Sequence, residues 1–265
     1  MGLLEGKRAL ITGIANERSI AYGIAKAFHR ESAQLAFTYA NEKLKKRVEE
    51  IAQEFGSNLL FECDVSKDEH ITNLKDWLSR EWGGLDILVH SIAFAPRDEF
   101  KGGVIDTSRE GFKIAMDVSV YSLIALTREL LPLMEGREGS IITLSYYGAE
   151  KVVPHYNVMG IAKAALESTV RYLAYDLGKL GIRINAISAG PVKTLAAYSI
   201  TGFHLLMEHT TRVNPFKRPI SIEEVGEASA FLCSEMASAI TGEVLFVDNG
   251  YHIMGVFERE EDYRS

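Results

Sequence analysis

A tyrosine and a lysine seven positions apart are the residues of this sequence best placed for acid–base chemistry. Tyr156 and Lys163 lie in a segment that we expect to be helical from about Tyr156 to Lys179. Positions seven apart return to nearly the same helix face, so the phenol and the ammonium should point the same way. A nearby ammonium favours the phenolate and lowers the tyrosine pKa from its reference value near ~10. The pair could act on an oxygen that gains negative charge, although a surface Tyr and Lys on an amphipathic helix would look the same.

The residues after the first expected strand could hold a phosphate. Gly13 follows the strand Arg8–Thr12, and a helix is expected from Ile20 to Glu31. A glycine there permits a sharp turn and a close approach of pyrophosphate, whose charge the helix N-terminus favours. The usual G-x-x-x-G-x-G spacing is absent, because Glu17 and Ser19 occupy the later glycine positions. Taken alone, this loop also fits a plain strand–turn–helix.

A carboxylate and an apolar residue, Asp64 and Val65, end the third expected strand. The Asp64 carboxylate could accept a hydrogen bond from an adenine amino group, and Val65 could pack on the ring. An N-cap for the next helix explains Asp64 equally well.

Short β-branched segments alternate with segments of helical period, which is typical of βα units around a parallel sheet. We expect strands at Arg8–Thr12, Gln34–Tyr39, Leu59–Val65, Leu85–Ile92, Ser140–Ser145, Ile182–Ser188 and Glu243–Val247. We expect helices at Ile20–Glu31, Glu42–Phe55, Glu69–Trp82, Arg109–Met134 and Tyr156–Lys179, and a last one opened by the capping box Ser221-Ile222-Glu223-Glu224. The prediction is an α/β fold: a single-domain, Rossmann-like, doubly wound sheet of about seven parallel strands with helices on both faces. Ligands of such sheets bind at the carboxyl ends of the strands.

Composition narrows the classes of function. The chain has 265 residues, 47% of them apolar, and a formal net charge of -7. One domain over 1–265 is expected, and the acidic excess argues against a nucleic-acid partner. No stretch is long and apolar enough to span a bilayer, no Cys/His spacing suggests a metal, and Cys63 and Cys233 are interpreted as reduced core residues. We therefore expect a cytoplasmic protein without metal or membrane partner.

Considered together, these motifs resemble the short-chain dehydrogenase/reductase superfamily, and within it closely resemble the bacterial enoyl-acyl-carrier-protein reductases that use NADH. The resemblance extends from Gly6 to about Gly250. It depends on Gly13-x5-Ser19-Ile20-Ala21, Asp64-Val65, His90-Ser91-Ile92-Ala93-Phe94-Ala95-Pro96, Leu144-Ser145-Tyr146, Tyr156-x6-Lys163 and Asn185-Ala186-Ile187-Ser188-Ala189-Gly190-Pro191.

The resemblance implies hydride transfer from NADH to the β-carbon of a trans-2-enoyl thioester on acyl carrier protein, the last reductive step of each fatty-acid elongation cycle. It implies catalytic roles for Tyr156 at the enolate oxygen, Lys163 at the nicotinamide ribose, and Tyr146 in a less defined role. The cofactor-binding residues that it implies are Gly13, Ala15, Ser19, Ile20, Asp64, Val65, Ser91, Ile92, Lys163, Val192, Lys193, Thr194, Leu195 and Ala196. The substrate-binding residues that it implies are Ala95, Tyr146, Tyr156, Met159, Phe203 and Met207.

Three further expectations concern the rest of the chain. An apolar segment at about 194–210 is interpreted as a lid over the acyl chain, with a buried helix as the alternative. The charged tail at about 256–265 is expected to be solvated. A homotetramer is implied by the resemblance alone.

Two departures from the ordinary short-chain pattern bear on the reaction. That pattern has Tyr four residues before Lys, where this chain has Met159, and a catalytic Ser near the position of Tyr146. Moving the Tyr three residues along a helix shifts its root by about 4.5 Å. We interpret this shift as the change needed to reach a thioester oxygen two carbons beyond the β-carbon.

Other functions stay open. A short-chain ketone or 3-oxoacyl reductase is the nearest alternative, and Met159 argues against it. A non-catalytic dinucleotide-binding sensor would not need Tyr156 and Lys163, and a purely structural α/β scaffold would need no cofactor. NADH is preferred over NADPH because no Arg follows Tyr39 directly, although Arg18 and Lys43 lie close in sequence.

Overall fold

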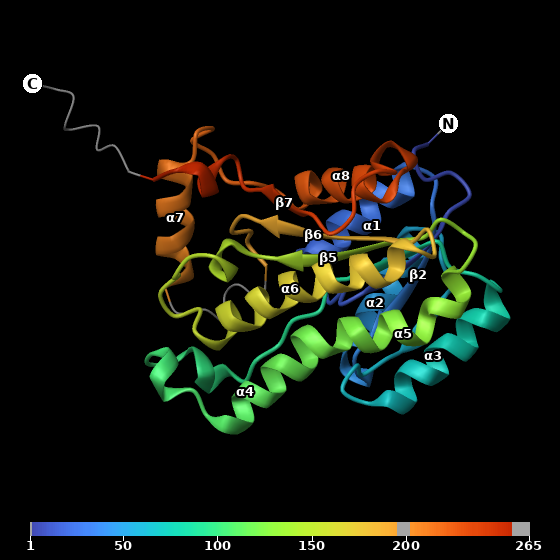
Figure 1. The fold of residues 1–265 in the computed structure, drawn as a ribbon, viewed down its shortest axis with the longest axis horizontal. Coiled ribbons are helices and arrows are strands. Elements are labelled where there is room, and N and C mark those ends of the chain that lie inside the picture. Colours follow the sequence, from blue (N-terminus) through green and yellow to red (C-terminus); the bar gives the residue numbers. More distant parts are fainter. Residues whose placement is uncertain (1, 195–201, 256–265) are drawn as a thin grey trace, which may run out of the picture.

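The computed structural model describes residues 2–194 and 202–255 and has one sheet at its centre (Figure 1). The sheet has seven strands in the order β3-β2-β1-β4-β5-β6-β7, and every neighbouring pair is parallel. The strands are β1 (Arg8–Thr12), β2 (Gln34–Tyr39), β3 (Leu60–Glu62), β4 (Ile87–His90), β5 (Ser140–Ser145), β6 (Arg183–Ala189) and β7 (Val244–Val247). This is the doubly wound order, with its switch point between β1 and β4, and the predicted fold class is confirmed.

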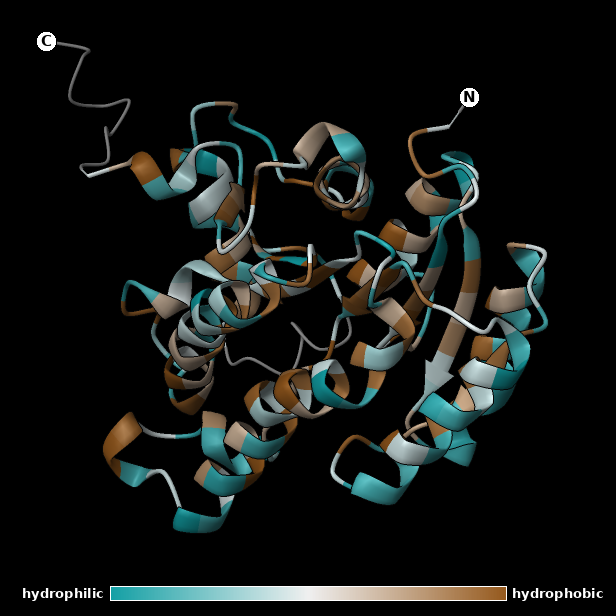
Figure 2. Ribbon diagram, turned by 45° about the vertical axis from the view of Figure 1, so that its right-hand side comes forward, coloured by the Kyte–Doolittle hydropathy of each residue, from teal (hydrophilic) through white to brown (hydrophobic). Residues whose placement is uncertain are grey.

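Helices cover both faces of the sheet because the strands are apolar on both sides. On one face, Ile11 and Val89 belong to a core shared with α1 (Ile20–Arg30), α2 (Glu42–Glu54) and α8 (Ile222–Cys233). On the other face, Leu10 and Leu88 belong to a core shared with α3 (Asp68–Glu81), α5 (Ser122–Met134) and α6 (Val158–Gly178). Successive strand residues point to opposite faces, so adjacent residues supply different cores. Figure 2 shows the hydrophilic residues gathered mainly on the outer sides of the helices.

The predicted continuous helix Arg109–Met134 is wrong in one respect. The structure has α4 (Arg109–Met116), a π-helical segment η3 (Asp117–Tyr121) and then α5. A π turn holds one extra residue, which redirects the side chains that follow. Here the turn places Ser119, which is fully buried, against the backbone of Phe94 beyond β4.

The strands predicted at 59–65 and 85–92 are shorter than expected: extended strand geometry covers only Leu60–Glu62 and Ile87–His90. The residues beyond them form the loops at the carboxyl edge of the sheet. The remaining elements are α7 (Phe203–Val213) and the short 3-10 helices η1 (Arg97–Phe100), η2 (Val104–Asp106), η4 (Tyr147–Ala149), η6 (Glu235–Ala237) and η7 (Tyr251–Ile253). Figure 1 shows α7 beyond the arrowheads of β5, β6 and β7.

No described helix combines the length and apolar character needed to cross a membrane. Within the described residues there is likewise no group of three or more His, Cys, Asp and Glu side chains that could hold a metal ion.

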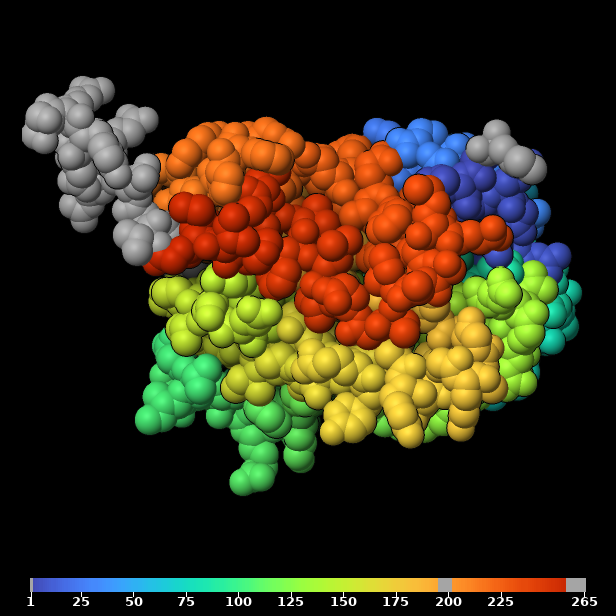
Figure 3. Space-filling model, turned by 45° about the horizontal axis from the view of Figure 1, so that its top comes forward, coloured from blue at the N-terminus to red at the C-terminus, as the bar shows by residue number. Residues whose placement is uncertain are grey.

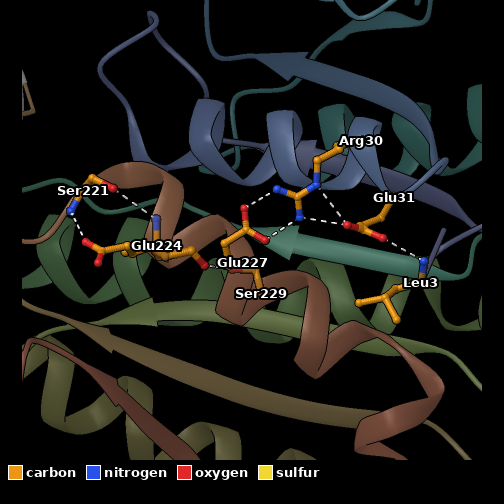
Figure 4. A network of polar contacts seen from close by, with 8 residues as sticks. Leu3, Arg30, Glu31, Ser221, Glu224, Glu227 and Ser229 are labelled. Atoms are coloured by element: carbon orange, nitrogen blue, oxygen red, sulfur yellow. Dashed lines mark hydrogen bonds and ion pairs between the residues drawn. The ribbon is translucent and has the colours of Figure 1, made fainter.

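Helices α1 and α8 pack closely at two glycines. A Cβ added to Gly226 would overlap the backbone oxygen of Gly23, and one added to Gly23 would overlap that of Ile222. Figure 4 shows the polar contacts beside this crossing, where Arg30 of α1 binds both carboxylate oxygens of Glu227 on α8.

The predicted capping box begins α8 (Figure 4). The Ser221 hydroxyl accepts from the Glu224 N–H at 3.2 Å, and the Glu224 carboxylate accepts from the Ser221 N–H at 2.9 Å. These two bonds satisfy donors that a helix end would otherwise leave unpaired.

We expect Gly226→Ala to lower the free energy of unfolding by about 1–3 kcal/mol, because the added methyl forces α1 and α8 apart. Gly178→Ala is the matched control: this glycine also lies in a helix, but an added Cβ would meet nothing within 4 Å. There the change should be neutral or stabilising by up to about 1 kcal/mol. Urea denaturation followed by circular dichroism measures both, and equal stabilities would contradict the proposed close contact.

Candidate active site

A cavity of about 590 Å³ opens at the carboxyl ends of β1, β4, β5 and β6, beside α7. Its size is typical of a small-molecule site, and its place is where doubly wound sheets bind ligands. Most of the predicted site residues line it: Gly13, Ala15, Ser19, Ile20, Ser91, Ile92, Ala95, Tyr146, Tyr156, Met159, Lys163, Val192, Thr194 and Phe203. The structure therefore brings together residues from every segment on which the resemblance depends, except Asp64-Val65.

Six predicted residues are not seen in the cavity wall. Asp64, Val65, Lys193 and Met207 are described but do not line it. Leu195 and Ala196 lie outside the described residues.

Asp64 closes the turn that precedes α3. Its carboxylate accepts from the N–H and the hydroxyl of Ser66, at 3.1 and 2.7 Å, and pairs with Lys67 at 3.2 Å. The N-cap of α3 is Lys67 rather than Asp64, so Asp64 acts one turn earlier than an N-cap would. Its role toward an adenine ring stays a prediction.

The loop after β1 has the geometry of a phosphate site. Gly13 has φ +80°, and an added Cβ would overlap the carbonyl oxygen of Ser91, so the two loops touch through backbone alone. Ser19, the N-cap of α1, makes no side-chain bond to the first helical turn; its hydroxyl donates instead to the carbonyl of Asn16. Among the described residues the N–H groups of Ile20 and Ala21, the first two of α1, have no backbone partner, and such donors suit a pyrophosphate.

Tyr156 does not lie on the helix that carries Lys163. Helix α6 begins at Val158, and its N-cap Asn157 has φ 44°. The Asn157 side chain donates to the Glu99 carbonyl at 3.2 Å, which ties this turn to η1. The predicted shared helix face is therefore wrong, and so is the 4.5 Å shift derived from it, because a residue with positive φ interrupts the helical geometry between the two side chains.

Tyr156 and Lys163 reach the same cavity by tertiary packing. Burial raises the pKa of Tyr156 above its usual range, so the phenol is neutral at pH 7 and can donate a hydrogen bond. The expected lowering of this pKa by Lys163 is wrong, because desolvation dominates. Burial also lowers the pKa of Lys163 to about 8, against an opposing effect of Glu167. The Lys163 ammonium donates to the Leu144 carbonyl on β5 at 2.6 Å.

Tyr146 directly follows β5 and packs its ring edge-on against Tyr156, with centroids 5.1 Å apart. Its hydroxyl is buried and has no hydrogen-bond partner among the described residues. Burial raises the pKa of Tyr146, so this hydroxyl also keeps its proton. A buried polar group without a partner costs about 1–3 kcal/mol. Such a cost is relieved when a ligand supplies the missing acceptor.

Met159 and the π turn shape the apolar side of the cavity. The Ser119 hydroxyl accepts from the Phe94 N–H at 3.0 Å and lies 3.9 Å from the Met159 sulfur. The interrupted helix therefore holds the segment after β4 against the side of the cavity that Met159 lines.

Arg97 and Phe100 also line the cavity and were not predicted. Both come from η1, a short 3-10 helix that has no hydrophobic period and no catalytic spacing to reveal it. Leu206, from the predicted lid segment, is another addition, and further lining residues belong to the quoted motifs or lie beside the predicted residues: Asn16, Ala93, Phe94, Leu144, Ser145, Ala189, Gly190 and Pro191.

The chain is similar to known proteins over nearly its whole length. Residues 13–252 match the family model described as enoyl-(acyl carrier protein) reductase. The enoyl-acyl-carrier-protein reductase (NADH) of Aquifex aeolicus is 80% identical over 265 residues, covering 100% of this chain and 98% of the relative. The Escherichia coli reductase of the same name is 49% identical, covering 98% and 99%.

Solved structures agree with this similarity. The crystal structure of the Aquifex aeolicus reductase superposes with a TM-score of 0.95 over 97% of this chain and 100% of that one, at 80% identity. The Anaplasma phagocytophilum reductase in complex with NAD gives 0.93, at 46% identity, over 98% and 96% of the two chains. The Bacillus cereus reductase with NADP+ gives 0.94, at 46% identity, over 97% and 100%. With this cavity at the strand ends and these relatives, the chain belongs to the enoyl-acyl-carrier-protein reductase family.

Proposed function

We propose that this protein reduces the C2–C3 double bond of trans-2-enoyl thioesters on acyl carrier protein with NADH, in the last reductive step of each fatty-acid elongation cycle. The observation that carries the proposal is one cavity lined by Tyr146, Tyr156 and Lys163 beside the Gly13 loop. The names of relatives 80% and 49% identical support the same reaction and cofactor.

The residues around the cavity fit a nicotinamide dinucleotide. When bound, this cofactor supplies the hydride. The Gly13 turn and the N-terminus of α1 would hold the pyrophosphate. Lys163 uses one of its three ammonium N–H donors in the hydrogen bond to Leu144, and the other donors can bind the ribose hydroxyls.

Charges near the end of β2 favour NADH over NADPH. Lys45 pairs with Glu42 at 3.2 Å, and Arg47 pairs with Glu17 at 2.6 Å. A 2′-phosphate at this end of the sheet would have to compete with these carboxylates for the same cations. The pairs are exposed and individually weak, so we expect a preference rather than strict exclusion.

Hydride addition to the β-carbon places negative charge on the thioester oxygen. The neutral Tyr156 phenol donates a hydrogen bond to that oxygen and can pass it a proton. Tyr146 offers a second buried hydroxyl beside it, and Lys163 adds positive potential. Ala95, Met159 and Phe203 form apolar walls that exclude water from the reacting carbons.

Met159 is the feature that disfavours a ketone reductase. Its thioether has no proton to donate, so it cannot assist a carbonyl oxygen on the carbon that receives hydride. A non-catalytic sensor would leave the buried hydroxyl of Tyr146 unexplained.

Of the segment expected as a lid at about 194–210, residues 195–201 lie outside the described residues, and we propose that its described helix α7 covers the cavity. Phe203 and Leu206 of α7 face the cavity, and Phe203 and Met207 are buried. We place this lid within a single domain over 1–265. The tail at 256–265 lies outside the described residues, and the cytoplasmic location stays a prediction.

NADH oxidation with two thioesters tests the reaction. Crotonyl thioester should be reduced at least ~10-fold faster than acetoacetyl thioester. The hydrogen-bond donors of the site are placed for the thioester oxygen, so the ketone oxygen of acetoacetyl thioester would lack a donor, and the loss of one such donor costs that much or more. NADPH should give a lower kcat/KM than NADH. Faster turnover of the acetoacetyl thioester would reject the proposal in favour of ketone reduction.

Tyr156→Phe should lower kcat roughly 10–1000-fold while leaving the NADH dissociation constant nearly unchanged, because it removes one donor to the developing oxyanion. Tyr147→Phe is the control: Tyr147 packs against Phe246 and Tyr251 and does not line the cavity. Stopped-flow NADH oxidation and fluorescence titration measure the two effects. Wild-type turnover in Tyr156→Phe would remove this residue from the mechanism.

We also propose a homotetramer. Tyr172 and Tyr175 of α6 are 76% and 86% exposed, and Figure 3 shows the yellow stretch that contains α6 lying along the molecular surface. Exposed aromatics of this kind favour protein contacts. Native mass spectrometry should give four chains, and Tyr172→Glu with Tyr175→Glu should reduce that number. A wild-type monomer at micromolar concentration would contradict the assembly.

A further inference from the structure

We propose that Glu167 is a positioning residue for Lys163: its buried carboxylate, held by Ser145, keeps the ammonium charged and in place while the cofactor is bound. The inference rests on the proposed role of Lys163 at the ribose. It concerns a buried carboxylate that the reaction described above does not use.

The geometry links α6 to the end of β5 at two adjacent points. Lys163 and Glu167 are four residues apart on α6 and share a face, and each is only 6% exposed. The Lys163 ammonium donates to the Leu144 carbonyl at 2.6 Å, and the Ser145 hydroxyl donates to Glu167 Oε1 at 2.5 Å. Consecutive strand residues are thus held by consecutive helical turns.

The link between Glu167 and Ser145 leads to the cavity that contains Tyr146. Ser145 lines the cavity and is followed directly by Tyr146. Movement of the Glu167 side chain would therefore disturb Ser145 and, through it, the end of β5, which holds the Lys163 ammonium at Leu144 and carries Tyr146.

The carboxylate also sets the charge of the lysine. Burial lowers the pKa of Lys163 to about 8, and Glu167 is the group that opposes this change. Burial likewise raises the pKa of Glu167, while the hydrogen bond from Ser145 lowers it. Below about pH 8 the Lys163 side chain is a charged ammonium. Above that pH it is a neutral amine and no longer supplies positive potential to the site. Without the Glu167 charge, that loss begins at a lower pH.

The other charged or titratable groups acting on this pair have different effects. On the Glu167 carboxyl, Glu150 raises the pKa and Arg171 lowers it. His90 of β4 is fully buried near Lys163, and burial lowers its pKa to about 3, so it adds no positive charge beside the ammonium at neutral pH.

A purely structural role would not need a charged group. A neutral amide could accept the Ser145 hydrogen bond with the same shape, and burying a carboxylate costs more than burying an amide. The charge is useful because a second buried charge, the Lys163 ammonium, lies one turn away.

The test is the pH dependence of NADH affinity and of kcat/KM with crotonyl thioester, from pH 6 to 10. In wild type, both should fall as the pH rises through about 8. In Glu167→Gln, the fall should move about one unit lower, because an opposite charge nearby shifts a pKa by at least that much. At pH 6 this variant should remain within a few-fold of wild type.

Two further variants provide an intermediate case and a control for this shift in the pH profile. Ser145→Ala keeps the Glu167 carboxylate but removes the hydrogen bond to it. The pH at which NADH affinity and kcat/KM fall should therefore also become lower, but by less than in Glu167→Gln. Asp176→Asn removes a carboxylate from the exposed side of the same helix, about 20 Å along its axis from Lys163, and should match wild type.

An unchanged pH profile in Glu167→Gln, or an equal loss at every pH, overturns the inference. If Glu167→Gln fails to fold, Ser145→Ala carries the test by the same criterion. Titration of the Lys163 side chain by carbon-13 NMR in the free protein separates the two proposals. An unshifted Lys163 titration in the variant rejects the Glu167 role, whereas a wild type that reduces no enoyl thioester rejects the proposed function.

Discussion

All seven strands run in one direction, and this constraint determines where chemistry can occur. The carboxyl ends of parallel strands lie along one edge, so the loops after β1, β4, β5 and β6 meet there although they are far apart in sequence. Helices on both faces bury the strands and leave that edge as the place where polar side chains and a ligand can meet. The cavity lies at this edge.

Burial then decides the protonation of the groups collected there. The pKa values of Tyr146 and Tyr156 are raised by desolvation, so both phenols keep their protons. The same effect works in the opposite direction on Lys163, whose charged form is the disfavoured one. The site therefore combines neutral hydrogen-bond donors with a buried cation. Burial disfavours the charge of that cation, and the nearby Glu167 carboxylate opposes this effect.

Much of the fold was predictable because its signals are local. Strands Arg8–Thr12, Gln34–Tyr39 and Ser140–Ser145 have the bounds expected from the sequence, since β-branched runs between turn residues depend on near neighbours. The π turn at Asp117–Tyr121 was missed because the helical period continues through it. The turn instead coincides with a contact between Ser119 and the backbone of Phe94, which is distant in sequence.

The sequence by itself determined the class of the protein: the order of its βα units, the residues at their ends, and a family resemblance that the comparisons confirm. The tertiary structure alone decided how those residues meet. Helix α6 begins only after Asn157, so Tyr156 lies outside the helix that carries Lys163, and their convergence comes from packing rather than from spacing. Their pKa values likewise follow from burial in the assembled core, because desolvation depends on all the elements that surround a group, and no local pattern records them.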